Sequence, residues 1–200
     1  MSGPALQLWL VRHGQTEWSQ SRRHTGTTDL PLTPAGEGEA RALRPWLAAE
    51  PFTRVFVSPR QRAGRTCELA GLGDRAEVEH DLAEWDYGDY EGVTSNEIHK
   101  TRPGWNVFRH GAPGGESPED VATRADRLIA RLAQLSGNVA LFSHGQFCSS
   151  LGARWLELPI AEGRKLALVT ASLSVLALSP DHDDTRQIKL WNATPAGPER

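Results

Sequence analysis

The chain has 200 residues, of which 38% are apolar and 24% charged, as is typical of one globular domain with its own core. Its formal charge of −3 and pI near 6.2 argue against nucleic-acid and membrane binding, because such proteins usually carry a basic excess. Cys67 and Cys148 are too few for a disulfide scaffold, and the N-terminus has neither the basic region nor the long apolar run of a targeting or spanning segment. We therefore expect a single cytoplasmic domain over residues 1–200.

Strands alternate with helices along the first half of the chain. The stretch that begins at Leu32 predicts a helix with Thr33 as its N-cap and Pro34 at its first position, kinked or divided by Pro45. Residues 86–116 are rich in Gly and Pro, and we expect a loop-rich insertion over one edge of the sheet. The other expected elements of this half are strands over 6–11, 54–58 and 76–82 and a helix over 60–71.

The second half continues the same alternation. Ser117 caps a helix that extends to Leu135, with an acidic first turn and apolar residues at helical spacing. A nearly continuous apolar strand follows at 138–143, as expected where helices cover both faces of a sheet. Strands over 171–179 and 186–192 close the chain, with a hairpin turn across PDHDD. The whole pattern predicts an α/β fold, a three-layer α/β/α sandwich with a mostly parallel central sheet.

Two predicted strands end in the same kind of signal, VRHG and FSHG. In open α/β sheets, ligands bind beyond the carboxyl ends of the strands. If the two strands are neighbours, His13 and His144 meet at one edge beside Arg12, and each is followed by a glycine that allows close backbone approach. The next strand brings Arg60 and Arg62 to that edge, and Glu84 follows the third strand. These residue types predict an anion site with a candidate nucleophile and a candidate acid.

Several of these residues also have a purely structural interpretation. A histidine at a strand end often only satisfies loop backbone, and surface arginines are usually solvated, so we expect Arg60, Arg65, Arg22 and Arg23 to be structural or peripheral. The chain has no dinucleotide fingerprint, no GxxxxGK[ST] loop, no HExxH and no CxxC, so we expect no metal and no cofactor. Tryptophans are expected in the core at positions 9, 46 and 155, with one or two of Trp18, Trp85 and Trp105 walling a pocket.

An ordered set of motifs from about residue 8 to 145 resembles the histidine phosphatase superfamily, which includes phosphoglycerate mutases and many phosphatases. The motifs are LVRHGQTEW, HTGTTDLPLTPAGEGEA, VSPRQRAGRT, LAEWDYGDYEG, GESPEDV and FSHG. Within that superfamily, LAEWDYGDYEG and LPIAEGRKLALVTAS are similar to the phosphoglycerate-mutase-like acid phosphatases of actinobacteria, and EWSQSRRHTGTTDLPLTPAGEG is similar to the sedoheptulose bisphosphatases of fungi.

The resemblance implies a phosphoglycerate-mutase-like fold and assigns roles to individual residues. His13 would be the nucleophile that forms a phosphohistidine, Arg12, Arg62 and His144 would surround the transferring phosphoryl group, and Glu84 would give a proton to the leaving oxygen. Independently, an imidazole can attack phosphorus, and arginines suit the equatorial oxygens of the transition state. The phosphate- and substrate-binding set implied by the resemblance is Arg12, Arg62, His144, Gln15, Ser19, Thr25 and Gly26.

Two positions depart from patterns in the superfamily. Ser19 stands where many members have an asparagine, and Ser149 stands where the fungal bisphosphatases have an arginine for the far phosphate. The leading interpretation is a metal-independent phosphomonoesterase for small phosphorylated metabolites. Phosphoglycerate mutase-type transfer, a sugar bisphosphatase and a catalytically idle binding domain remain as alternatives. The natural substrate is left open, and so is a homodimer.

Overall fold

The computed structural model of the chain describes residues 4–179 and 185–195. Its centre is one six-stranded sheet with the strand order β3-β2-β4-β1-β5-β6. The neighbouring pairs among β1 to β4 are parallel, whereas β5 pairs antiparallel with β1 and β6. The strands are β1 (Gln7–Arg12), β2 (Phe52–Val57), β3 (Ala76–Val78), β4 (Asn138–Ser143), β5 (Leu173–Ser179) and β6 (Thr185–Ala193). The predicted α/β fold with a mostly parallel sheet is confirmed.

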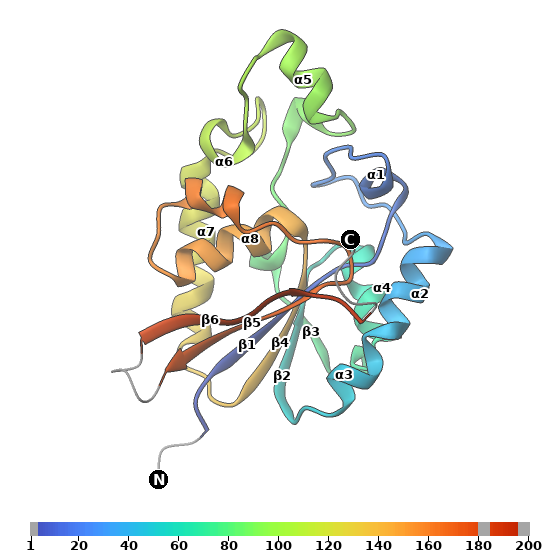
Figure 1. The fold of residues 1–200 in the computed structure, drawn as a ribbon, viewed down its shortest axis with the longest axis vertical. Helices are drawn as coiled ribbons and strands as arrows, with labels where there is room; N and C mark the ends of the chain where they lie inside the picture. The colour runs from blue at the N-terminus through green and yellow to red at the C-terminus, as the bar shows by residue number, and fades with distance from the viewer. Residues whose placement is uncertain (1–3, 180–184, 196–200) are drawn as a thin grey trace.

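Helices cover both faces of this sheet (Figure 1). On one face lie α7 (Pro118–Leu132) and α8 (Gly145–Trp155), and on the other lie α2 (Pro34–Ala42), α3 (Arg44–Ala48) and α4 (Gln61–Leu69). The remaining helices are α1 (Glu17–Gln20), α5 (Ser95–Thr101) and α6 (Val107–His110), with 3-10 turns η1 (Gly73–Arg75), η2 (His80–Leu82), η3 (Gly88–Tyr90) and η4 (Ile160–Lys165). The sheet is therefore the middle layer of three.

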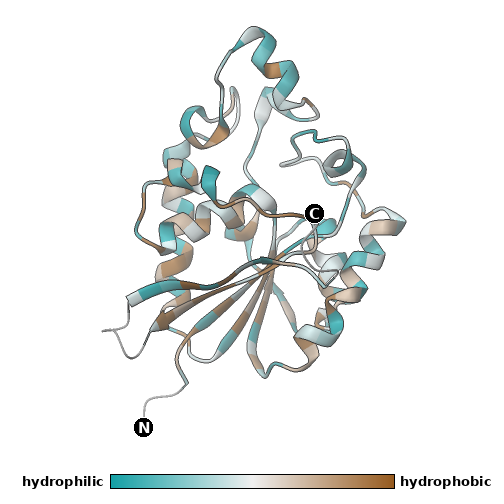
Figure 2. Cartoon of the chain, in the orientation of Figure 1, coloured by the Kyte–Doolittle hydropathy of each residue, from teal (hydrophilic) through white to brown (hydrophobic). Residues whose placement is uncertain are grey.

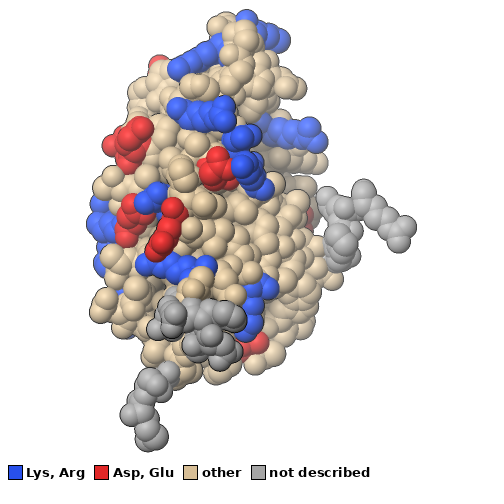
Figure 3. Space-filling model, turned by 60° about the vertical axis from the view of Figure 1, so that its left-hand side comes forward, with Lys and Arg blue, Asp and Glu red and all other residues tan. Residues whose placement is uncertain are grey.

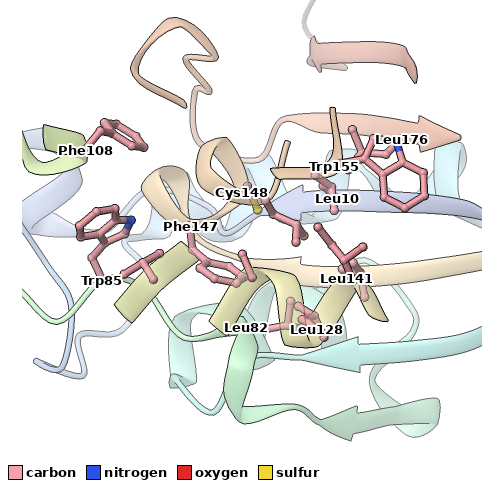
Figure 4. Packing of buried hydrophobic residues seen from close by; sticks show 14 of the residues in the cluster. Leu10, Leu82, Trp85, Phe108, Leu128, Leu141, Phe147, Cys148, Trp155 and Leu176 are labelled. Carbon is pink, nitrogen blue, oxygen red and sulfur yellow. The ribbon is translucent and has the colours of Figure 1, made fainter. Parts of the chain in front are cut away.

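The central strand β4 shows why the sheet holds two cores. Val139 and Leu141 belong to the cluster under α7 and α8, and the alternate residues Ala140 and Phe142 belong to the cluster under α3 and α4. Successive side chains of a strand point to opposite faces, so a strand covered on both faces reads as a continuous apolar run. Several strands are accordingly largely brown in the hydropathy view, whereas the edge strand β6 also shows teal (Figure 2). Figure 4 shows the first cluster, where residues from β1, β4, α7 and α8 pack together.

Two predicted helix boundaries agree with the structure. The side chain of Thr33 accepts a hydrogen bond from the backbone of Gly36 at the start of α2. Leu43 separates α2 from α3 two residues before Pro45, where a kink or division was expected. Ser117 forms a capping box with Asp120 at the start of α7. Each cap satisfies backbone donors that the first turn of a helix leaves unpaired.

Two expectations differ from the structure. The strand expected over 76–82 ends at Val78 and becomes η2, because the Glu79 side chain accepts a hydrogen bond from the Asp81 backbone and starts a turn there. Trp46, expected in the core, is 38% exposed on α3. The last two strands pair antiparallel as expected, while the hairpin turn expected at 180–184 lies outside the described residues.

The segment expected as an insertion, 86–116, contains η3, α5 and α6 and extends above the sheet edge where β1 and β4 end (Figure 1). Trp85 and Trp105, expected as candidates for a pocket wall, are instead buried in the core cluster. Among residues 4–179 and 185–195, no helix is long and apolar enough to cross a membrane.

Candidate active site

Two histidines meet where β1 and β4 end. The register of these parallel strands pairs Arg12 with Ser143, so the next residues, His13 and His144, leave the sheet side by side. The His13 backbone N–H donates to the Ser143 carbonyl at 3.0 Å. The two rings lie 5.1 Å apart between centroids at an interplanar angle of 64°. Adjacent parallel strands thus bring together residues that are far apart in the sequence.

The ring of His13 has one nitrogen committed to the backbone. Its Nδ1 lies 2.7 Å from the carbonyl oxygen of Gly14. Because a carbonyl only accepts, Nδ1 carries the proton and Nε2 keeps its lone pair in the neutral ring. Burial lowers the pKa of His13 well below its ordinary value, and the positive charges of Arg62 and Arg12 lower it further. His13 is therefore held neutral, with Nε2 available as a nucleophile.

The second histidine is held between a cation and a hydroxyl. Arg62 Nε donates to His144 Nδ1 at 3.1 Å, and His144 Nε2 lies 2.7 Å from Ser58 Oγ. An accepting Nδ1 requires the proton of the neutral ring to be on Nε2, which then donates to Ser58. Burial, followed by the charge of Arg62, lowers the pKa of His144 well below its ordinary value.

Arg62 lies fully buried on α4 and connects the histidine to a loop. Its Nη1 donates to the Thr28 carbonyl at 3.0 Å, and its Nη2 donates to the Thr25 and Gly26 carbonyls at 3.1 Å each. A guanidinium presents five donors in a rigid fork, which suits one side chain that must satisfy several acceptors. Arg62 therefore fixes the loop of residues 25–28 relative to His144.

Glu84 accepts hydrogen bonds from three backbone N–H groups. Oε1 accepts from Trp85 at 3.0 Å and Phe147 at 2.8 Å, while Oε2 accepts from Gln146 at 3.0 Å. Gln146 and Phe147 belong to the first turn of α8. Burial raises the pKa of Glu84, and the backbone hydrogen bonds and Arg62 offset part of that rise. Oε2 has fewer donors than Oε1, which makes it the oxygen better placed to carry a proton.

The guanidinium of Arg12 faces the histidines from the end of β1. Its Nη1 donates to the Leu168 carbonyl at 2.5 Å. Its Nε is buried without a hydrogen-bond partner among the described residues. A Cβ added to Gly145 would lie 3.1 Å from Arg12 Cζ, so a larger residue there would press on the guanidinium. Arg12 also lines the cavity next to His13 and so brings its positive charge to an anion bound there.

These groups border a cavity of about 450 Å³. Of the residues predicted for the site, Arg12, His13, Ser19, Thr25 and Glu84 line it. His144 and Arg62 are fully buried next to His13 and lie outside that lining.

Two more predicted residues face elsewhere. The Gln15 side chain accepts from Thr33 Oγ1 at 2.9 Å, and the Gly26 N–H donates to the Glu91 carboxylate at 2.7 Å. Neither residue belongs to the cavity lining. Ser19 lies on the wall but also makes the capping box of α1 with Thr16.

The cavity wall includes residues that the sequence did not single out, or placed at the periphery. Arg22 and Arg23, expected to be peripheral, both line it, as does Arg164 of η4. Ser149, noted in the sequence as a departure from the bisphosphatase pattern, lines it too, and the lining polar residues that the sequence did not single out are His24, Tyr87, Ser95, Asn106 and Gln146. Arg22 and Arg23 could have been found from the sequence, because they lie two or three residues before Thr25, which belongs to the predicted site. No predicted site residue lies near Arg164 in the sequence. In the described part of the chain, no group of three or more His, Cys, Asp or Glu side chains is arranged to hold a metal ion.

Comparison with known proteins agrees with this geometry. A model of the histidine phosphatase superfamily (branch 1) matches residues 8–194. An acid phosphatase of Mycobacterium tuberculosis is 43% identical over 175 residues, covering 84% of this chain and 85% of that protein. A sedoheptulose 1,7-bisphosphatase of Saccharomyces cerevisiae is 38% identical over 184 residues, covering 76% and 68%.

The fold is matched as well. A solved structure of an open reading frame from Mycobacterium tuberculosis superposes with a TM-score of 0.89 at 39% identity, over 94% of this chain and 98% of that one. Family, coverage and fold confirm the resemblance carried by the sequence motifs, and with it the expectation of an enzyme of the phosphatase class. The chain belongs to branch 1 of the histidine phosphatase superfamily.

Proposed function

We propose that this protein is a metal-independent phosphomonoesterase that hydrolyses small phosphorylated metabolites through a phosphohistidine on His13. One observation carries the proposal above the others. The Nδ1 atom of His13 is bonded to the Gly14 carbonyl, which leaves the Nε2 lone pair in a cavity that four arginines also line. A neutral imidazole beside a cationic surface suits attack on a phosphate ester.

The first step transfers the phosphoryl group. His13 Nε2 attacks phosphorus, the bond from phosphorus to the ester oxygen breaks, and Glu84 Oε2 gives a proton to the departing alkoxide. In the second step a water molecule attacks the phosphohistidine while Glu84 takes a proton from it. The P–N bond breaks, His13 regains its lone pair, and inorganic phosphate leaves. Glu84 ends the cycle protonated, as it began.

Positive groups around His13 supply the electrostatic stabilisation. Arg12 has an unused buried N–H, and Arg62 holds His144 within ring contact of His13. Fixed donors aimed at the developing charge need no reorganisation during the reaction. We therefore assign Arg12 to binding the phosphoryl oxygens. Arg62 contributes by holding the His144 ring against His13 and by adding positive charge next to it. A sugar bisphosphatase is the second candidate, favoured by the yeast relative of that name.

One observation supports a cellular compartment for the enzyme, and another supports its domain organisation. Cys67 and Cys148 are both free and buried, which suits a reducing compartment, so we place the enzyme in the cytoplasm. The family match over residues 8–194 supports one catalytic domain that includes the 86–116 segment. Assembly as a homodimer is testable by light scattering on the purified chain.

A rapid-quench experiment tests the mechanism. The enzyme is mixed with a phosphomonoester labelled in its phosphate, quenched and digested. We expect label on His13 that is labile in acid and stable in alkali, and we expect none in His13→Ala, which should also lose turnover. His80→Ala, a change of an exposed histidine outside the cavity, is the matched control. Label on a serine or cysteine, or turnover by His13→Ala, would disprove the mechanism. Adding 2,3-bisphosphoglycerate to the assay separates hydrolysis from mutase-type transfer.

A further inference from the structure

Arginines from two separate segments line the same cavity. Arg22 follows α1, and Arg164 lies in η4. Figure 1 shows α1 and the orange turn next to α8 on opposite sides of the space above the sheet edge. Both side chains are exposed at the wall of the cavity. Among the described residues that line it, Glu84 is the single acidic one. The outer part of the cavity is therefore cationic.

These two arginines are not used to hold the protein together. Arg23 donates to the Gly92 carbonyl at 2.6 Å, whereas the side chains of Arg22 and Arg164 make no hydrogen bond or ion pair within residues 4–179 and 185–195. The acid next to Arg164, Glu162, is paired with Lys165. Basic side chains also predominate at the upper end of the face shown in Figure 3, which is the end that carries the site.

The backbone at Arg22 is held in an uncommon conformation. Its φ is +58°, in the left-handed region that favours glycine. Such a conformation costs on the order of 1 kcal/mol or more and persists where surrounding structure fixes it. Here the N–H groups of Arg22 and Arg23 donate to the carbonyls of Ser19 and Trp18. The turn directs this arginine to the cavity wall at some cost to the backbone.

The number of positive charges exceeds what one phosphate needs. A phosphomonoester carries about two negative charges near neutral pH, and the cations beside His13, Arg12 and Arg62, balance them. Arg22, Arg23 and Arg164 then remain on the wall. A cavity of about 450 Å³ is also within the range of roughly 300–1,000 Å³ that holds ligands larger than a phosphate ion. The surplus positive charge and the extra volume both indicate a ligand that is larger and more negatively charged than one phosphate group.

We propose that Arg22 and Arg164 bind a second anionic group, a phosphate or a carboxylate, at the end of the substrate remote from the scissile phosphate. The proposal rests on the proposed function and narrows its substrate class to phosphorylated metabolites with two anionic ends. Ser149 of α8 is uncharged, and its Oγ lies 2.9 Å from the Gly145 carbonyl oxygen and 2.6 Å from that of Leu166. The cation on this side comes instead from η4, whose last turn Leu166 caps.

Substrate pairs that differ by one anionic group test this subsite. The pairs are fructose 6-phosphate with fructose 1,6-bisphosphate for a second phosphate, and glycerol 3-phosphate with 3-phosphoglycerate for a carboxylate. We expect kcat/KM to be higher for the doubly anionic member of at least one pair, and the pair identifies the group. The advantage should shrink as salt is raised from 0.01 to 0.5 M, since exposed charges are screened.

Variants locate the effect. Arg164→Gln and Arg22→Gln should each lower the ratio of kcat/KM, doubly to singly anionic, by roughly five- to tenfold, as expected for a charged hydrogen bond at a partly exposed site. Arg41→Gln, on the outer surface of α2, removes the same charge outside the cavity and should leave the ratio at the wild-type value.

An equal kcat/KM for both members of both pairs would overturn the subsite. So would a ratio that Arg164→Gln and Arg22→Gln change no more than Arg41→Gln does. Labelled phosphohistidine on His13 in the same preparation would show that only the subsite had failed. Absence of that label would instead count against the proposed function.

Discussion

Arg62 Nε donates a hydrogen bond to His144 Nδ1 at 3.1 Å, between two side chains that are both fully buried. The remaining donors of Arg62 go to three backbone carbonyls of the loop 25–28. One guanidinium thus fixes the ring of His144 beside His13 and the loop that contains Thr25 of the cavity wall. Removing it would leave several buried acceptors without donors, each of which costs free energy.

Arg62→Met should therefore lower the free energy of unfolding by roughly 2–5 kcal/mol and reduce turnover. Urea denaturation monitored by circular dichroism measures the first effect. Arg65→Met, on the same helix, is the control. Arg65 pairs with Glu37 and Glu68 at the surface, and exposed pairs contribute about 0–1 kcal/mol. Equal destabilisation by the two variants would show that the buried contacts of Arg62 carry no special weight.

Glu84→Gln should separate substrates by their leaving groups. An alkoxide leaves poorly without a proton, whereas p-nitrophenolate leaves readily. We expect a loss of roughly 10²- to 10⁴-fold in kcat/KM on alkyl phosphates, typical of a missing general acid, and a clearly smaller loss on p-nitrophenyl phosphate. If both substrates slow by one factor, Glu84 positions the phosphate or the loop instead.

The protonation of Glu84 also predicts how activity on alkyl phosphates changes with pH. Burial raises the pKa of Glu84, and only the protonated acid can donate to the leaving group. Activity on alkyl phosphates should therefore be present below this raised pKa and fall as the pH rises through it. In Glu84→Gln that alkaline limb should shift or vanish, which a profile of kcat/KM from pH 4 to 9 would measure. A limb that stays in place belongs to another residue.

Arg124 connects the two segments that carry Glu84 and its donors. It donates to both carboxylate oxygens of Glu116, at 2.9 and 2.8 Å. Its Nη1 also donates to the carbonyls of Asp81 and Ala83, at 2.8 and 2.7 Å. Its guanidinium lies 4.4 Å from the ring centroid of Phe147, whose N–H holds Glu84. Arg124 is therefore a positioning residue for Glu84.

Arg124→Met should lower kcat on alkyl phosphates more than on p-nitrophenyl phosphate and move the alkaline limb of the pH profile. It does so because the Glu84 carboxylate loses its fixed position relative to its backbone donors. Arg127→Met is the control, since Arg127 also contacts Asp81 but extends to the surface. A variant that is merely less stable, with an unchanged limb and equal losses on both substrates, would contradict the positioning role.

Burial lowers the pKa of His24 to about 4. Its ordinary value is about 6.5, so the unfolded chain binds a proton between these values that the folded chain does not. Stability is then full above pH 6.5 and is lost as the pH falls toward 4. The difference in unfolding free energy between wild type and His24→Gln should shrink by on the order of 3 kcal/mol over that interval. A difference that stays constant from pH 7 to 4.5 would contradict this assignment.

Chelators should leave the activity intact, because arginines supply the charge that Mg²⁺ supplies in other phosphoryl-transfer sites. The measurement is kcat after dialysis against EDTA, with and without added divalent ions. Loss of activity that one specific ion restores would require a metal in the mechanism.

The convergence of His13 and His144 could be predicted from the sequence because it depends on local signals. Each residue directly follows an apolar strand, and neighbouring parallel strands end at the same edge of a sheet. The caps at Thr33 and Ser117 were recognisable for the same reason, since a capping side chain and the backbone N–H that donates to it lie within four residues. The mostly parallel sheet follows from the alternation of strands and helices.

The cavity wall could not be predicted in this way. Arg164 lies there because η4 packs on α8, and that contact joins segments whose sequences carry no matching pattern. Gln15 and Gly26 were predicted for the site because they lie in the same sequence motifs as site residues, yet they do not line the cavity. Gln15 bonds to Thr33 and Gly26 bonds to Glu91 instead. Trp46 was misplaced because hydrophobicity alone does not tell which side of a short helix faces the sheet.

The pairing of Arg12 with Ser143 in the register of β1 and β4 has a consequence for how such a protein can diverge. A single-residue insertion or deletion in either strand would turn the following histidine to the opposite face of the sheet and dismantle the pair. The segments that carry Arg22, Asn106 and Arg164 join the strands as loops and short helices, where changes of length and sequence are tolerated. New substrates can therefore be acquired by altering these connections, while the reaction itself is inherited with the two strands.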